Sequence, residues 1–178
     1  MSCKNNDTKR ILEQQKDLKK KTLVFENINK SWIFYIPELQ PQSQILIANW
    51  TEWRLFLEEL RQKPKSSIGA FKKKSKKLTQ KTSNLTNTLP QQINISAIKS
   101  RIAVLNTQIR MLDLYMNLQN IPDQKVALLI PEINAAILSF SQQLEEIIRK
   151  NTIPMEKGES DMLKMLDTSR AIPNNSKI

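Results

Sequence analysis

The sequence predicts an all-α protein: an elongated helical bundle in which residues 95–150 form a long antiparallel helical hairpin with coiled-coil-like packing. Two observations predict this fold class. Through most of the 178 residues, apolar side chains recur at alternating intervals of three and four, or at intervals of seven, which is the period of one helix face. The whole chain contains only two glycines, Gly69 and Gly158, which argues against a turn-rich β architecture and against a glycine loop that could bind phosphate.

The chain is long enough for one domain with loose ends. We expect a flexible tether over residues 1–7 and a single helical domain over residues 8–153. The domain divides into a basic first half, residues 8–89, and the hairpin, residues 94–150. The tail, residues 154–178, turns polar and carries one short apolar patch that is compatible with a short helix.

The first helix is expected over residues 8–32. Lysine and glutamine occupy most positions between its apolar residues, so the helix needs cover from the rest of the domain. Pro37 and Pro41 then predict a loop. The apolar stripe has a strict interval of seven: Ile11, Leu18, Phe25 and Trp32.

The second helix is expected over residues 43–62, with a heptad seam. Within it, Trp50 and Trp53 lie one turn apart, and each combines a large apolar area with an indole N–H. Such residues belong either in the core, which is the commoner place, or at a partner surface. The seam consists of Leu46, Trp50, Trp53, Leu57 and Leu60.

The third helix, residues 68–87, has a thin apolar stripe and the densest charge in the chain. Residues 61–81 hold nine lysines and arginines and no acidic residue. Because lysine dominates over arginine and aromatic residues are scarce, nonspecific contact with phosphates of a lipid surface or of nucleic acid is favoured over base reading. The candidate residues for anion or membrane contact are Lys72, Lys73, Lys74, Lys76 and Lys77.

The hairpin carries the strongest periodicity. Asn94 or Ser96 can cap its first helix, and the short break around Pro122 implies that the second helix folds back antiparallel. The three–four alternation continues through Pro131, which predicts one continuous second helix with a kink near Ala127. The apolar positions are Ile95, Ile98, Ile102, Leu105, Ile109, Leu112 and Met116, followed by Val126, Ile130, Ile133, Ile137, Phe140, Leu144 and Ile147.

No catalytic, metal or cofactor site is predicted. The chain has no histidine, which removes the commonest general base and metal ligand, and a single cysteine cannot form a thiolate zinc site. Ser96 and Lys99 match a Ser-x-x-Lys spacing, but the companion motifs of that enzyme class are missing. Adjacent glutamates such as those at 58–59 point about 100° apart on a helix and cannot readily share a proton or a metal.

The first residues carry a resemblance. Ser2 and Cys3, followed by a polar tract, resemble the start of a mature Gram-negative bacterial lipoprotein, in which the cysteine after the cleaved signal peptide is lipidated. The resemblance covers only these residues. It implies lipid attachment at Cys3 and a place on the periplasmic side of the outer membrane. The alternative is a free thiol in a cytoplasmic protein.

Of the net charge of +11, +10 lies in the first half of the chain: residues 1–90 carry 18 basic and 8 acidic residues, and residues 91–178 carry 10 and 9. The sequence therefore predicts a non-enzymatic interaction or scaffolding protein of the cell envelope. Its partner is expected to be a protein, with an anionic membrane surface as a further candidate. The alternative is a cytosolic helical protein associated with nucleic acid.

Overall fold

The computed structural model describes residues 4–152, with side chains from Lys9 onward, and this part of the chain is helical with no strand. The all-α prediction is confirmed. The elements in chain order are α1 Lys4–Ser31, α2 Pro41–Ile47, α3 Thr51–Arg61, α4 Ile68–Leu85, a short 3-10 helix η1 Gln91–Ile93, α5 Ser96–Asn117 and α6 Asp123–Thr152.

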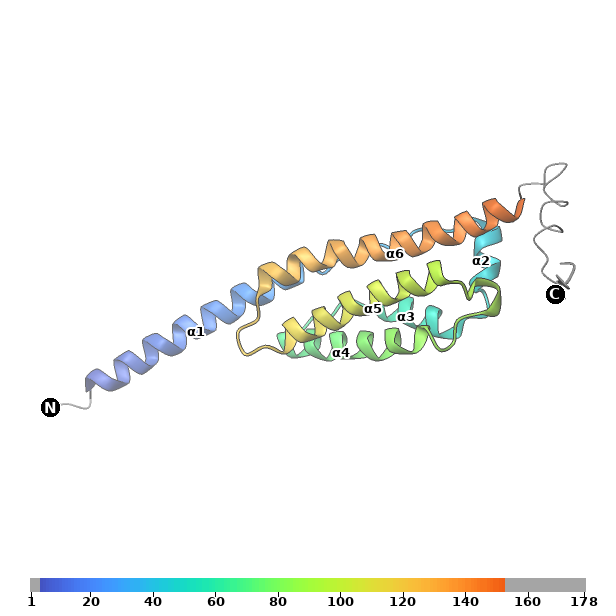
Figure 1. The fold of residues 1–178 in the computed structure, drawn as a ribbon. Helices are drawn as coiled ribbons and strands as arrows, with labels where there is room; N and C mark the ends of the chain where they lie inside the picture. The colour runs from blue at the N-terminus through green and yellow to red at the C-terminus, as the bar shows by residue number, and fades with distance from the viewer. Residues whose placement is uncertain (1–3, 153–178) are drawn as a thin grey trace, which may run out of the picture.

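The helices form an elongated bundle (Figure 1). Helix α5 packs between α4 and α6, and α3 covers the other side of α4. The C-terminal half of α1 lies along α6, whereas its N-terminal half projects beyond the bundle (Figure 1). As a result, the beginning of α1 and the end of α6 lie at opposite ends of the molecule.

The predicted hairpin is present as α5 and α6. Its two helices are joined by the short connection 118–122, and α6 continues through the exposed Pro131. Arg101 ties the pair together, since its Nε donates to the carbonyl oxygen of Ser139 at 3.1 Å. The inner seam of α5 is fully buried at Ile98, Ile102, Leu105, Ile109, Leu112 and Met116.

The prediction of a single helix over residues 43–62 is wrong, because the chain forms two helices there, α2 and α3. Pro41, expected in a loop, is the first residue of α2, a position where the missing N–H of proline costs no hydrogen bond. At Trp50 the backbone leaves the helical conformation, with φ −86° and ψ 87°. This break turns the indole into the core, where its Nε1 donates to the hydroxyl of Thr88 at 3.0 Å.

Two other helix starts differ from expectation. Helix α1 begins at Lys4, so residues 4–7 of the expected tether are helical. Neither Asn94 nor Ser96 caps α5: the cap residue is Ile95, and there is no side-chain capping hydrogen bond. The expected helix in the tail lies outside the described residues.

Helix α4 is more firmly packed than its thin stripe suggested. Phe71 is fully buried and meets Phe25 of α1 and Trp32, directly after α1, edge-on, with ring centroids 5.9 and 4.9 Å apart. Leu78 and Leu85 are also fully buried. The heptad stripe of α1 therefore finds its cover on α4, but only in the C-terminal half of α1.

The segment between α1 and α2 runs extended beside α6 and is fixed by side chains of that helix. The Asn134 amide donates to the carbonyl oxygen of Ile33 at 3.0 Å and accepts from the N–H of Tyr35 at 3.0 Å. The Glu145 carboxylate accepts from the N–H of Gln40 at 2.9 Å. These bonds satisfy backbone groups that have no partner in a helix or sheet.

Candidate interaction surfaces

The two tryptophans proposed as a partner surface lie in the core. Trp50 is 1% exposed and Trp53 is 4% exposed. Their rings stack 5.6 Å apart, and Trp53 lies 4.4 Å from the ring of Phe140 on α6. The partner-surface interpretation is therefore wrong, and the core alternative holds. The physical reason is that α3, α6 and the segment after α4 close around both indoles.

The lysines of α4 do not form one uniform surface. Lys73, Lys76 and Lys77 are exposed and Lys72 is half-buried. Lys74 is only 7% exposed, and its Nζ lies 2.6 Å from a carboxylate oxygen of Glu59 on α3.

Lys74 is therefore not available for an anion or a membrane, and its assignment to that contact is wrong. The burial of Lys74 could have been predicted from the sequence, because Lys74 lies three residues after Phe71 and four before Leu78, on the buried seam. Cys3, the expected lipid attachment site, lies outside the described residues.

Polar groups also line the seam between α4 and α5. The Ser75 hydroxyl donates to the Asp113 carboxylate at 2.7 Å, and the Thr82 hydroxyl lies 3.2 Å from the amide oxygen of Asn106. Both serine and threonine are buried. Together with the Lys74–Glu59 pair, these contacts link α4 to its two neighbours, α3 and α5.

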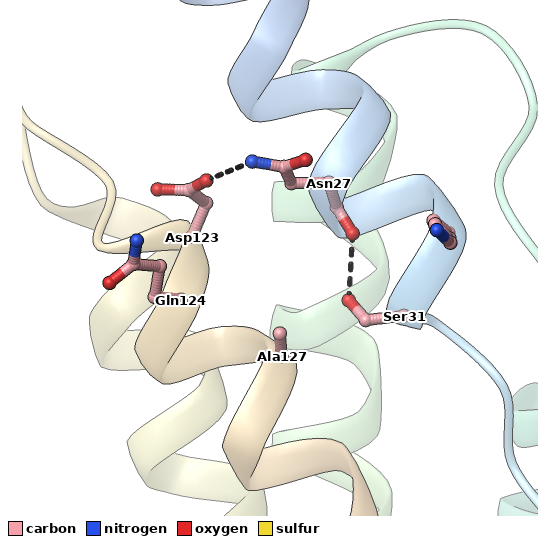
Figure 2. Close-up of a pocket in the computed structure, with 6 residues that line it drawn as sticks. Asn27, Ser31, Asp123, Gln124 and Ala127 are labelled. Carbon is pink, nitrogen blue, oxygen red and sulfur yellow. Dashed lines mark hydrogen bonds between the residues drawn. The ribbon is translucent and has the colours of Figure 1, made fainter.

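A shallow hollow lies between α1 and α6, and polar groups that line it bond to one another. Figure 2 shows Asp123 accepting a hydrogen bond from the amide of Asn27, at 2.6 Å, while Ser31 donates to the backbone oxygen of Asn27 at 2.9 Å. The carboxylate is thus engaged in joining the two helices. The hollow is lined by Asn27, Lys30, Ser31, Asp123, Gln124 and Ala127 and has a volume of about 400 Å³.

Among residues 9–152, whose side chains the structure describes, no three acidic or cysteine side chains lie together in a way that could hold a metal ion. None of the described helices is long and apolar enough to cross a membrane.

The outer side of α5 carries a second apolar stripe that the sequence reasoning missed. Val104, Met111, Leu114 and Leu118 are 52%, 40%, 59% and 42% exposed. Val104, Met111 and Leu114 are spaced by seven and three residues, which places them on the face of α5 opposite the buried seam, and Leu118 follows directly after the helix. Leu128 of α6 is 70% exposed. The spacing of the outer residues of α5 can be read from the sequence, but the inner seam has the longer and more regular apolar pattern.

A second apolar area lies where the extended segment crosses α6. Tyr35 and Leu138 are 69% and 46% exposed there. They line a groove of about 460 Å³ together with Ile36, Pro37, Asn134 and Ala135.

The projecting part of α1 is the third exposed apolar surface. Residues 9–23 form the projecting half of α1, and every residue in this range is exposed. The stripe that is covered at Phe25 and Trp32 continues here uncovered, with Ile11 and Leu18 at 50% and 63% exposure. Leu12 and Leu23 add 52% and 57%.

Comparison with known proteins adds no assignment: no protein-family model, no curated protein and no solved structure matches this chain. The surfaces themselves are therefore the basis for any statement about function.

Proposed function

We propose that the protein is a non-enzymatic helical scaffold of the bacterial cell envelope that binds a partner protein at a membrane surface. The observation that carries the proposal is the outer stripe of α5, formed by Val104, Met111 and Leu114 and continued by Leu118 directly after the helix. Helix α5 is packed by α4 and α6 on one side and presents a second heptad face to solvent on the other. Monomeric soluble domains seldom leave such a row of large apolar residues uncovered.

The chemistry of this stripe fits an amphipathic helix of another chain. Ser100, Ala103 and Thr107 lie on the same side of α5 and are uncharged, while the exposed Arg110 borders the stripe one turn before Leu114. Apolar residues at alternating intervals of three and four accept the knobs of a facing helix, and small residues allow close approach. A partner helix with an uncharged heptad seam is therefore the expected ligand.

Site-specific photo-cross-linking in the native cells tests the partner. A photoreactive residue at Leu114 should give one protein adduct, and the cross-linked peptide should belong to an amphipathic helical segment. The matched control is the same residue at Lys99, an exposed position in the first turn of α5. Adducts that are equally frequent at both positions, or absent at Leu114, would contradict the proposal. An adduct with a second copy of this chain would replace the partner protein by self-association.

Attachment to the membrane through Cys3 is the second part of the proposal, and it is supported by the Ser2–Cys3 sequence. The native gene should encode a charged, then apolar, then small-residue segment ending at Ser2. Metabolic labelling with a palmitate analogue should mark the wild-type protein and not the Cys3→Ser variant. Met1 as the true start of translation, or equal labelling of both proteins, would remove the anchor.

A nucleic-acid partner is the second candidate, favoured by the exposed Lys73, Lys76 and Lys77, which lie on one side of α4. Binding to duplex DNA should then weaken steeply with salt, because each phosphate contact releases a counterion. Replacing these three lysines by glutamine should flatten the salt slope. Binding that is confined to acidic liposomes would count against this candidate.

A further inference from the structure

Both edges of the outer stripe of α5 carry a basic side chain. Going round α5 from its seam with α4 to its seam with α6, at about 100° per residue, the order of side chains is Arg110, Leu114, Met111 and the half-buried Tyr115. Arg110 therefore forms the edge next to α4. At the other edge, the exposed Lys125 of α6 has its Nζ 6.0 Å from the centre of the Tyr115 ring. The large apolar residues thus lie between an arginine and a lysine.

The charges of Arg110 and Lys125 are not compensated within the described part of the chain. Neither side chain takes part in an ion pair there. The carboxylate of Asp113, one turn after Arg110, is engaged towards α4, where it accepts from the Ser75 hydroxyl at 2.7 Å. The exposed Glu132 lies about 10 Å further along α6 than Lys125, which is beyond contact distance. The two edges of the stripe therefore present positive charge to solvent.

Helix α4 adds to the basic edge next to Arg110. Ser75 marks the side of α4 that faces α5, because its hydroxyl bonds to that helix, whereas Lys74 faces α3. Lys72 and Lys76 come next round α4 beyond Ser75, on the side away from Lys74. Lys72 is half-buried and Lys76 is exposed. Basic side chains from two helices therefore border the stripe on this side.

The middle of the stripe favours a facing helix over a lipid surface. Between the two basic edges lie three small exposed residues, Ser100, Ala103 and Thr107. Small side chains let a facing helix approach closely, whereas they add little apolar area to a face that sinks into a bilayer. The exposed Glu132 beside the stripe would be repelled by an anionic lipid surface. Two copies of this basic surface would repel each other as well.

We propose that the outer stripe of α5 binds an acidic amphipathic helix of a partner protein, whose carboxylates on the two sides of its apolar seam pair with Arg110 and Lys125. The inference rests on the proposed partner-binding function and names the chemistry of the partner. The acidic residues are expected at the heptad positions that flank a helix seam. Charge complementarity speeds the encounter with such a helix and disfavours a basic one.

Two synthetic peptides test the proposal with the full-length protein. Each has about three heptads with leucine at the seam positions, and the flanking positions carry glutamate in one peptide and lysine in the other. Fluorescence anisotropy measures their affinities at about 50 and 300 mM NaCl. We expect the glutamate peptide to bind about tenfold or more tightly than the lysine peptide, and this preference should shrink at the higher salt concentration.

Because the whole chain is basic, charge variants locate the contact. Arg110→Gln with Lys125→Gln should weaken binding of the glutamate peptide by about three- to tenfold, since one exposed ion pair contributes up to about fivefold. The matched control is Lys73→Gln with Lys77→Gln, two exposed lysines on the side of α4 away from α5, and it should change binding by less than about twofold. Arg110→Glu with Lys125→Glu should make the lysine peptide the tighter ligand.

The apolar variant is Leu114→Ser, and its control is Leu138→Ser, whose exposed leucine lies on another helix. Only Leu114→Ser should weaken binding of the glutamate peptide. Equal affinity for the two peptides, binding of neither, or equal losses in variants and controls would overturn the proposal. It would also fall if Leu114→Ser weakened binding to phosphatidylglycerol vesicles and not to the peptide. A cross-link from Leu114 to a helix without an excess of acidic residues would overturn this inference alone, whereas the absence of any adduct would remove the proposed function itself.

Discussion

The pair formed by Lys74 and Glu59 gives a direct test of how the bundle is held together. The ammonium and carboxylate lie 2.6 Å apart, with only 8% and 12% of the two side chains exposed. Replacing Lys74 by methionine keeps the length of the side chain and removes the charge. The carboxylate of Glu59 then loses its ion pair in a place that water reaches poorly.

The expected loss is about 2–3 kcal/mol, below the 3–5 kcal/mol typical of a fully buried pair because both groups keep some contact with water. With an m-value of about 2 kcal/mol/M, the urea midpoint should fall by about 1–1.5 M. Far-UV circular dichroism during urea unfolding measures this shift. Lys73→Met is the matched control: its side chain is exposed, so the change should stay within about 0.5 kcal/mol.

A double variant separates loss of charge pairing from loss of packing. Lys74→Met with Glu59→Leu removes both charges, and such replacements are often neutral or stabilising. This double variant should therefore unfold at a higher urea concentration than Lys74→Met alone. If the single variant at Lys74 is as stable as Lys73→Met, or if the double variant is the least stable of all, the reasoning about the buried pair is refuted.

Three further tests address the core, the extended segment and the end of α6. Phe140→Ala should cost about 3–5 kcal/mol and change the tryptophan fluorescence, because the ring packs on both Trp50 and Trp53; an unchanged urea midpoint would count against this core. Asn134→Ala should cost about 1–3 kcal/mol and speed hydrogen exchange at the Tyr35 amide, unless another group replaces the bond. The hydrogen bond from the Arg149 guanidinium lowers the pKa of Glu146. This ion pair should persist above the unfolded-state pKa and be lost as pH falls through the lower folded-state value. An NMR titration should show the Glu146 midpoint rising in Arg149→Gln.

The helix periodicity predicted much of the fold because apolar spacing alone decides which face of a helix can be buried. The inner seam of α5 and the continuity of α6 through Pro131 follow from that rule. The break at Trp50 does not, because residues 43–62 satisfy the heptad pattern equally well as one helix. The break places the Trp50 indole where Thr88 accepts its N–H, and Thr88 is 38 residues away in the chain.

The candidate surfaces likewise combine features that the sequence determined with features that only the tertiary packing decided. Sequence alone determined that the chain is helical, that its first half is basic and that an amphipathic stripe runs through α1. It could not determine which part of each stripe finds a cover, since that depends on how far each neighbouring helix extends. Tertiary structure buried Lys74 and both tryptophans, and left Ile11, Leu18 and the outer side of α5 exposed. Periodicity is a property of one helix, whereas burial is decided by the elements packed around it.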